Sequence, residues 1–550
     1  MTPQIIEDPD ALCRRHLVPG MHVHVASTMS RPNALLLAVA RVFRGRAVFD
    51  VSSNAFHANM HALAIAGVVR HAITCFAGDT YPSPRPNPLY AHLPEGKPFT
   101  VEEWSLLALL QRLIAGACGN PVAVTTSLAG SDLESRGTRL PAEVPDARDC
   151  LTVPALRPDV TLLHATCADR RGNLYLNGPR GEGWWGAMAA RRGVLATVER
   201  VVDTPPRGGV SIPADRVLGI ARCEFGAHPQ GLPPWPECGF AGYRDDYAFL
   251  AELAGTFARP GGPDSWFDRW VLAPAGHLDY LTELGPDRLA ALRRLDPIRR
   301  PVARVAPSWR ERHVVVASRA IADRVRAAGY RTLLAGIGTA HIASWLAAAQ
   351  LARDGHALQV HAELGLIDMS PAAGDAFLFA QSHVARSRAH GDSLDVLGAL
   401  TAGGYGRALA VLSAGEIDPA GRINSSRTAD GRYLVGSGGA NDFATHLETL
   451  VVAPASPRKL VPRVHFVTCP GQNVLTVATQ YGRLVRESAA VPFRLATWMA
   501  PDEDTGADPV ATLRDRTSWP VPDSSPEWEK PITDEELSLL RTLDPEGFYR

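Results

Sequence analysis

Lysine is nearly absent from this 550-residue chain: Lys97, Lys459 and Lys530 are the only three, so arginine supplies 53 of the 56 basic residues. The 57 acidic residues balance them and leave a formal net charge of −1. A nucleic-acid-binding protein needs a basic stripe, and the sequence has none. The composition therefore argues against a nucleic-acid partner, and we attribute the arginine excess to genome composition.

The chain also lacks paired cysteines and long apolar runs. Its eight cysteines are scattered and form no Cys-x-x-Cys pair, so we expect neither a metal site nor a redox motif. Apolar runs such as residues 34–43 are well short of the ~18 residues of a membrane span. The first residues are polar and acidic, unlike a signal peptide. We therefore expect a cytoplasmic protein with no membrane partner.

What the chain does have is length and ordinary globular composition, with 46% hydrophobic and 21% charged residues. A chain of this length exceeds a single core, so two or more domains are expected. An Arg- and Pro-rich stretch without clear periodicity lies at residues 293–313 and marks a boundary. We predict a first domain over residues 1–300, a linker at 301–313, a second domain over 314–500, and a tail at 501–550 that packs on the surface.

Both halves open with the same succession of elements. Residues 22–26 read as a strand, 34–43 as a helix and 46–52 as the next strand, which is a βαβ unit. In the second half a strand at 331–338 runs into a glycine turn and an amphipathic helix, and the next strand follows near 357–365. The sequence therefore predicts an α/β fold with two related, tandem, open parallel-sheet domains.

One carboxylate, Glu363, stands at the end of the strand pattern VHAE, directly before Leu364 and Gly365. Ligands of open parallel sheets bind at the carboxyl ends of the strands. A carboxylate in that place can attack an acyl group and form a mixed anhydride. Gly365 would let the chain turn sharply and let a substrate approach. A helix cap or a structural salt bridge is the alternative interpretation of Glu363.

Two glycine-rich turns precede predicted helices. The turn GSGGAND contains Gly436, Gly438 and Gly439, and the turn GIGTA contains Gly336 and Gly338. Glycines at such turns allow main-chain N–H groups to point at an anion. Neither turn fits the phosphate-loop or the full dinucleotide pattern. A tight turn without a ligand remains the alternative for both.

Polar side chains in two further loops are candidates. Asn424, in GEIDPAGRINSS, could donate to a developing oxyanion, although such an Asn also commonly fixes a turn. Ser127 and Ser131, in SLAGSDLES, could bind a substrate carboxylate through hydroxyls and main-chain amides. His164 is expected in the core or behind a residue of the site, and a direct catalytic role is the less favoured alternative.

Taken in order, these segments resemble family I coenzyme A transferases, especially glutaconate CoA-transferase and the related steroid-degradation CoA-ester enzymes. Resemblance to the alpha subunit covers about residues 18–205 and is carried by GMHVHVAS, the segment 102–133 and PDVTLLHATCADRRGNLYLNG. Resemblance to the beta subunit covers about 315–490 and is carried by GIGTAHIASWLAA, AELGLID, INSS, GSGGANDFA and VHFVTCPG. The two subunits would be fused here, alpha before beta.

This resemblance implies a cleft active site, with Glu363 as the nucleophile that becomes a glutamyl-CoA thioester in a ping-pong transfer. In the family the glutamate stands in Ser-Glu-Asn-Gly or Glu-Ser-Gly contexts, and here the context is Ala-Glu-Leu-Gly. The turn 436–439 and Asn424 match segments that contact the thioester oxygen or CoA. The partners implied are an acyl-CoA and a carboxylic acid, with the CoA thioester as substrate and no bound cofactor or metal.

Alternatives stay open at this point. An acyl-CoA hydrolase or ring-opening hydrolase of the same family would use the same substrates, but such members tend to lack the glutamate. A ligand-sensing member of the fold would normally carry a DNA-binding segment. The donor could be a carrier-protein thioester. The sequence also leaves homo-oligomerisation, the donor and the acceptor undetermined.

Overall fold

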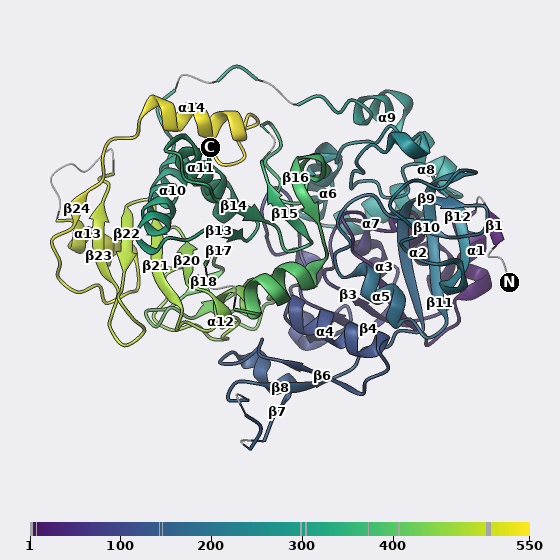
Figure 1. Ribbon diagram of the computed structural model, residues 1–550, viewed down its shortest axis with the longest axis horizontal. Coiled ribbons are helices and arrows are strands. Elements are labelled where there is room, and N and C mark those ends of the chain that lie inside the picture. The colour runs from purple at the N-terminus through teal and green to yellow at the C-terminus, as the bar shows by residue number, and fades with distance from the viewer. Residues whose placement is uncertain are drawn as a thin grey trace.

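The computed structural model of the protein describes residues 4–6, 8–141, 143–145, 147–297, 300–302, 305–371, 373–404, 407–501 and 508–550. The chain forms two lobes, each built around a sheet (Figure 1). The expected α/β fold with two tandem parallel-sheet domains is confirmed.

The first lobe contains a mainly parallel sheet in the order β1-β12-β11-β9-β2-β3-β4-β5, with β10 paired antiparallel to β9. The long central strands β9 and β11 pair in parallel. Val160 faces Gly193 at one end of the pairing, and Asp169 faces Val202 at the other. Because helices cover both faces, the strands are apolar along most of their length. Strand bounds are β1 Gln4–Ile6, β2 His22–Val25, β3 Phe49–Ser53, β4 Val69–Thr74, β5 Thr100–Glu103, β9 Val160–Asp169, β10 Leu174–Tyr175, β11 Gly193–Val202 and β12 Val217–Arg222.

Nine α-helices accompany this sheet in the described part of the chain. The buried helix α2 packs on α1, α3 and β11, whereas α5 packs on β2 and β9. Helix α4 begins after Ser105, whose side chain accepts a hydrogen bond from the Ala108 N–H. Helix bounds are α1 Pro9–His16, α2 Asn33–Phe43, α3 His61–Ile65, α4 Leu106–Ala117, α5 Gly183–Ala189, α6 Tyr247–Phe257, α7 Gly262–Phe267, α8 His277–Leu284 and α9 Pro286–Leu292.

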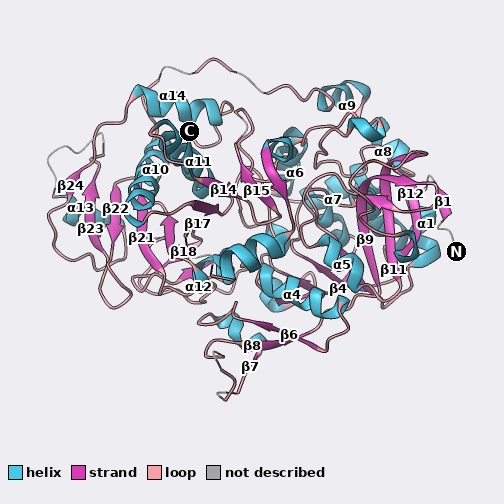
Figure 2. Cartoon of the chain, viewed as in Figure 1, coloured by secondary structure: helices cyan, strands magenta, loops and turns pink. Residues whose placement is uncertain are grey.

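The second lobe contains a sheet in the order β14-β13-β17-β20-β21-β22-β23-β24. Its first five strands are parallel, and β22 and β23 continue it in antiparallel fashion. Two small antiparallel strand pairs, β15–β16 and β18–β19, are separate from this sheet, whose strands Figure 2 shows in magenta. Strand bounds are β13 Thr332–Ala335, β14 Gln359–His361, β15 Leu366–Met369, β16 Ser387–His390, β17 Ala408–Ser413, β18 Glu416–Ile417, β19 Ile423–Asn424, β20 Thr449–Val452, β21 Val474–Thr479, β22 Gly482–Val485, β23 Arg494–Trp498 and β24 Glu527–Trp528.

Among the described residues, five α-helices belong to this lobe. Helix α10 starts with a capping box between Ser308 and Glu311, and it packs along α11 and β21. Helix α11 begins at Thr339, directly after Gly338. Helix bounds are α10 Trp309–Ala328, α11 Thr339–Arg353, α12 Ala440–His446, α13 Pro509–Arg516 and α14 Asp534–Leu543, and a π-helical segment spans Leu394–Ala402.

One hydrophobic core joins the two lobes. It contains leucines of α4 in the first lobe, among them Leu107 and Leu110, together with Leu397, Phe443 and Trp498 of the second. The Leu106 N–H also donates to the Gly438 carbonyl, and the Ala77 N–H donates to the Val435 carbonyl. The lobes therefore share packed side chains and main-chain hydrogen bonds along their common boundary.

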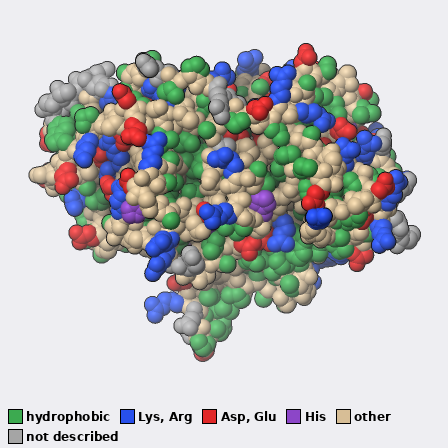
Figure 3. Space-filling view, turned by 45° about the horizontal axis from the view of Figure 1, so that its top comes forward, with side chains coloured by type: hydrophobic (Ala, Val, Ile, Leu, Met, Phe, Trp, Pro, Cys, Tyr) green, Lys and Arg blue, Asp and Glu red, His purple; other side chains and the backbone are tan. Residues whose placement is uncertain are grey.

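A three-stranded antiparallel sheet projects from the first lobe. It consists of β6 Val122–Thr125, β7 Thr138–Arg139 and β8 Leu151–Pro154. Val122 and Val124 on β6 are exposed, and Figure 3 shows hydrophobic side chains gathered on the lower projection. Elsewhere on that face, basic and acidic side chains are interspersed, in keeping with the near-zero net charge.

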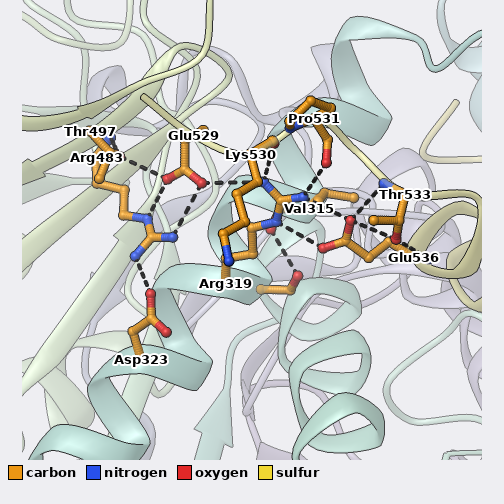
Figure 4. Close-up of polar contacts among 11 residues, drawn as sticks. Val315, Arg319, Asp323, Arg483, Thr497, Glu529, Lys530, Pro531, Thr533 and Glu536 are labelled. Atoms are coloured by element: carbon orange, nitrogen blue, oxygen red, sulfur yellow. Dashed lines mark hydrogen bonds and ion pairs between the residues drawn. The ribbon is translucent and has the colours of Figure 1, made fainter. Parts of the chain in front are cut away.

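The segment after residue 500 is more than a surface tail. Strand β24 pairs in parallel with β23 and extends the second sheet, and Leu513, Trp519 and Val521 are buried in its core. Figure 4 shows Arg319 of α10 holding this segment: it donates to the carbonyls of Lys530 and Pro531 and forms ion pairs with Glu529 and Glu536. This differs from the surface packing that we expected, because strand pairing is not local in sequence.

The linker also differs from the expected bounds. Helix α10 begins at Trp309, inside the segment 301–313, and residues 303 and 304 of that segment lie outside the described residues. Within the described ranges, no helix is long and apolar enough to cross a membrane.

Candidate functional site

Glu363 lies at the tip of a tight hairpin between β14 and β15. Figure 1 shows these two strands at the boundary of the two lobes. The Ala362 N–H donates to the Leu366 carbonyl at 2.9 Å, and the Gly365 N–H donates to the Ala362 carbonyl at 3.0 Å. Gly365 has a φ of 106°, as expected of the last residue in a three-residue hairpin loop. The hairpin thus presents Glu363 directly beyond the carboxyl end of β14.

A cavity of about 430 Å³ lies between the two lobes, and Glu363 is in its wall. This volume is within the usual range of small-molecule sites. Five expected glycines line it: Gly336, Gly338, Gly436, Gly438 and Gly439. The first lobe contributes, among others, Ser27, Arg31, Asn54, His57, Gln230 and Asp245. The cavity therefore collects the carboxyl ends of strands from both sheets.

The Glu363 carboxylate rests against the main chain of Gly439. A Cβ at Gly439 would lie 2.1 Å from Glu363 Oε2, which is far closer than atoms can approach. Any larger residue at position 439 would displace this carboxylate, which is the flexible end of the Glu363 side chain, whereas the φ of Gly439, −88°, does not itself call for glycine.

The electrostatic environment of Glu363 disfavours its charge. Burial raises its pKa to about 8, and Asp442 adds repulsion in the same direction. Within the part of the chain that the structure describes, no hydrogen bond or ion pair reaches this carboxylate. A carboxylate with raised basicity and open lone pairs, facing a cavity, is equipped to act as a nucleophile.

The glycine-rich turn 436–439 mostly joins the lobes. The Gly436 N–H donates to the Ser425 carbonyl at 2.8 Å, and the Gly438 N–H donates to the Cys75 carbonyl at 2.9 Å. These two N–H groups are therefore occupied, contrary to our expectation of an anion cradle built from all three glycines. The Gly439 N–H has no acceptor in the described ranges, and it stands beside the Glu363 carboxylate.

The second glycine turn lies under a loop of the first lobe. Gly338 has a φ of 105°, and a Cβ there would lie 3.4 Å from Pro84 Cδ. Its N–H donates to His341 Nδ1 at 2.8 Å, and the Gly336 N–H donates to the Val411 carbonyl. Both glycines shape the cavity wall, but their own N–H groups are occupied.

The role expected for Asn424 must be corrected. Its amide nitrogen donates to Glu416 Oε2 at 2.7 Å and to the Arg427 carbonyl at 2.6 Å, and its Oδ1 accepts from the Ser426 N–H. The side chain is fully buried and its donors are used, so it fixes the 424–427 turn and cannot serve an oxyanion.

The expected substrate contacts of Ser127, Ser131 and Gly365 also need correction. Ser131 Oγ donates to the Leu128 carbonyl, and Ser127 lies beside Asp442 behind the wall. A Cβ at Gly365 would lie 2.6 Å from the Gly391 carbonyl, so the close approach there is made by the protein's own main chain. Among the described residues that line the cavity, none of these three occurs.

Sequence reasoning missed the first-lobe side of the cavity. Arg31 follows β2 and Asn54 follows β3, and these neighbouring parallel strands end at the same edge of the sheet. In the sequence, the signal for both residues was a polar side chain that follows a predicted strand. His164, expected in the core, is buried and contacts Glu199 at 3.0 Å.

The donor set does not indicate a metal. No cluster of three or more His, Cys, Asp or Glu side chains suited to a metal ion occurs in the described ranges. The polar side chains of the wall are carboxyl, amide, hydroxyl, thiol and imidazole groups together with the cations Arg31 and Lys459.

Comparison with known proteins agrees with this arrangement. The family model "Coenzyme A transferase" matches residues 6–212. Over 133 residues the chain is 36% identical to one of the subunits of 3-oxoadipate CoA-transferase from Pseudomonas knackmussii, covering 24% of this chain and 47% of that protein. A 69-residue match, 33% identical, covers 12% of this chain and 26% of one of the subunits of glutaconate CoA-transferase from Acidaminococcus fermentans. The chain thus spans half or less of the curated relatives it matches.

Solved structures extend the likeness to the whole chain. The acyl-CoA transferase of E. coli O157:H7, solved as a thioester complex with CoA, superposes with a TM-score of 0.63 at 15% identity, covering 98% of this chain and 96% of that one. A Pseudomonas malonate decarboxylase superposes with a TM-score of 0.51 at 14% identity, covering 89% and 82%. Residues 6–212 match the coenzyme A transferase family model, and over nearly its whole length the chain has the fold of a solved acyl-CoA transferase.

Proposed function

We propose that the protein transfers coenzyme A from an acyl-CoA to a carboxylic acid, with Glu363 as the covalent nucleophile. The observation that carries the proposal is the position of Glu363: a carboxylate without hydrogen bonds in the described structure, at a hairpin tip, in a cavity between two lobes. The coenzyme A transferase match over residues 6–212 supports the same activity.

The first half-reaction begins when the ionised Glu363 attacks the thioester carbonyl carbon of the donor. The C–S bond breaks, CoA leaves as a thiolate, and an acyl-glutamyl anhydride forms. The thiolate then attacks the γ-carbonyl carbon of Glu363 and releases the donor as a free carboxylate. The enzyme is left as a glutamyl-CoA thioester.

The second half-reaction runs the same steps with the acceptor. Its carboxylate attacks the glutamyl thioester, the CoA thiolate leaves, and the thiolate attacks the acyl carbon of the new anhydride. Acyl-CoA is released and the Glu363 carboxylate is restored. The thioester bond is exchanged rather than hydrolysed, so the reaction calls for no ATP, metal or further cofactor.

The Gly439 N–H supports the reaction as an oxyanion donor. It has no acceptor in the described structure and adjoins the carboxylate that is attacked. One such donor stabilises a tetrahedral intermediate by about 3 kcal/mol.

We also propose, on the basis of the sequence, that the reaction takes place in the cytoplasm.

Steady-state kinetics tests this proposal. A transferase that works through a glutamyl thioester releases the first acid before the acceptor binds, so double-reciprocal plots at several fixed acceptor concentrations should be parallel. The Glu363→Gln variant should lose transfer. Intersecting lines, or CoA release that needs no acceptor, would favour direct transfer or a hydrolase instead.

A further inference from the structure

We propose that Cys167 and Cys238 form a reversible disulfide when the protein meets a hydroperoxide, and that this bond ties a surface hairpin to the central sheet of the first lobe. The two cysteines lie far apart in the sequence, so no short motif contains both. Neither is among the described residues that line the cavity. The inference therefore does not depend on the proposed function.

The fold brings the two thiols together. Cys167 lies on β9 and is fully buried, and Cys238 ends a short 3₁₀ helix in the loop after β12. A hydrogen bond joins their side chains, and both belong to one apolar cluster with Leu232 and Phe240. From such a contact, small side-chain movements bring the sulfur atoms to the S–S distance of about 2 Å.

The hydrogen bonds around Cys238 favour a thiolate on this residue. Its own S–H donates to the Trp235 carbonyl at 3.4 Å, so its sulfur is free to accept the S–H of Cys167. This bond lowers the pKa of Cys238 most, and the Phe240 N–H and the positive charge of Arg200 lower it further, against the opposing effect of burial. Reactive cysteines occur in such electropositive surroundings.

Arg200 is held next to Cys238 by the main chain. Its Nη1 donates to the carbonyl of Gly239, the next residue, at 2.9 Å. Arg200 itself is exposed and stands on β11, the neighbour of β9. The cation is thus fixed at the turn that carries Cys238.

The two cysteines differ in a way that assigns them separate roles. The hydrogen bond to Cys238 and burial raise the pKa of Cys167 above its ordinary value, so it stays a thiol. Cys238 keeps 6% of its surface exposed and lies between the exposed residues Glu237 and Gly239. A small oxidant therefore meets Cys238 first, and Cys167 acts as the resolving thiol.

The chemistry needs one hydroperoxide for each disulfide. The Cys238 thiolate attacks an oxygen of hydrogen peroxide, the O–O bond breaks, and hydroxide leaves and takes up a proton to become water. The sulfur of Cys167 then loses its proton and attacks the Cys238 sulfenic acid, whose S–O bond breaks to release a second water. Each sulfur loses one electron, and the peroxide gains two.

The disulfide would attach the tip of a hairpin that leads into the cavity wall. The hairpin spans residues 232–243, and its two end residues exchange main-chain hydrogen bonds of 2.9 and 3.0 Å. Cys238 lies at its tip, and Gln230 and Asp245, just outside its ends, line the cavity. The bond to β9 would therefore restrain an element that carries two residues of the wall.

Peptide mapping of the whole protein after treatment with hydrogen peroxide tests the pair. We expect a peptide that links Cys167 to Cys238, an intact mass lower by two hydrogen atoms, and recovery of both thiols with dithiothreitol. The absence of this linked peptide, or a link that uses another cysteine, would overturn the proposal. This measurement uses wild-type protein, so it does not depend on the folding of any variant.

Cys118→Ser is the matched control, because Cys118 is exposed at the end of α4 and forms no hydrogen bond with a second thiol in the described ranges. It should leave the Cys167–Cys238 link unchanged. Cys238→Ser should abolish the link. Cys167→Ser should leave Cys238 as a sulfenic acid that dimedone traps. Dimedone labelling of Cys118 but not of Cys238 in Cys167→Ser would overturn the assignment of Cys238 as the attacking thiol.

Arg200→Met tests the electrostatic part of the argument. At neutral pH the variant should form the link more slowly, by roughly threefold or more, because less Cys238 is thiolate. Arg170→Met is the control, since Arg170 is exposed and pairs with the exposed Asp203, and it should behave as wild type. Equal rates in Arg200→Met and wild type would refute the role of Arg200.

Hydrogen exchange measures the restraint on the hairpin. Amides of residues 232–243 should exchange more slowly in oxidised than in reduced wild-type protein, because the tip is then bonded to β9. Cys238→Ser should show no such difference after the same treatment. A linked peptide with unchanged exchange would refute the restraint on the hairpin.

Discussion

At the scale of single residues, Glu363 combines a raised pKa with open lone pairs. Burial and Asp442 make the carboxylate more basic than an exposed glutamate, which strengthens it as a nucleophile but leaves only a minor ionised fraction at neutral pH. Attack requires the ionised form. The rate of the first half-reaction should therefore follow the titration of this one group.

We predict that kcat/KM rises with pH and levels off above pH 8. Because the free enzyme must lose a proton from Glu363, the rate should fall about tenfold for each pH unit below that value. A pH-rate profile with a pH-stable thioester donor measures this. A profile that is flat from pH 6 to 9 would mean that Glu363 is ionised throughout, against the account.

Asp442→Asn identifies the titrating group. Asp245 and Glu182 also have raised pKa values, of about 7, in or near the site. Removal of the Asp442 charge should move the inflection to lower pH, because its repulsion raises the Glu363 pKa. An inflection that stays in place would assign it to another group.

From the sequence, the place of a residue in the site could be predicted only where it follows from the residue's position at the end of a strand. The position of Glu363 in the cavity wall was predictable because a strand pattern ends beside it and Gly365 follows, whereas its role as a nucleophile stays a prediction. The oxyanion role of Asn424 was wrong because Glu416 and the Arg427 carbonyl, which the sequence does not place, take its donors. Arg31 was missed because its burial in the cavity wall depends on the loops around it.

At the scale of elements, the site is a hairpin tip pressed against the start of a helix. The β14–β15 turn fixes the Glu363 main chain, and the turn before α12 supplies Gly439 against its carboxylate. Neither element alone fixes the position of the Glu363 carboxylate. A small change in the turn before α12 should therefore displace the Glu363 carboxylate at the tip of the β14–β15 hairpin.

We predict that Gly439→Ala abolishes transfer while the protein stays folded. The added Cβ would occupy the place of Glu363 Oε2, so the carboxylate must rotate away from the reacting position, which costs at least about 100-fold in kcat. Gly255→Ala in α6, where nothing lies within 4 Å of the added Cβ, should be indistinguishable from wild type. Circular dichroism and kcat together check both variants, and a Gly439→Ala enzyme with near-normal kcat contradicts the geometry.

The elements themselves were largely predictable. The strand expected at 22–26 is β2, and the helix expected at 34–43 is α2, which starts at Asn33. The strand expected at 331–338 is shorter, because main-chain pairing ends at Ala335 before the glycine turn. Local periodicity finds such elements, whereas the pairing of β24 with β23 depends on distant residues and could not be predicted.

At the scale of the whole molecule, packed side chains and hydrogen bonds hold the two lobes together. The α4 core and the 436–439 turn join the lobes, and residues 508–550 complete the second lobe through β24 and α14. Arg319 connects that last segment to α10 by two carbonyl contacts and two ion pairs.

We predict that Arg319→Met lowers the midpoint of thermal unfolding clearly. The variant would leave the largely buried Glu529 and Glu536 carboxylates without this partner, a loss on the order of 3 kcal/mol. Arg326→Met is the control, since its pairs with Asp323 and Asp354 are exposed and worth less than about 1 kcal/mol. Equal midpoints for the two variants in a calorimetric scan would show that the segment is not held by Arg319.

The most direct measurement of the central claim is the intact mass of the protein after incubation with acetyl-CoA, succinyl-CoA and glutaryl-CoA without an acceptor. We predict a CoA-sized adduct in the wild-type protein, borohydride-sensitive and mapped to Glu363, with no adduct in Glu363→Gln. An adduct at another residue, or steady thiol release from wild type and Glu363→Gln alike, would contradict the assignment of Glu363 as the nucleophile.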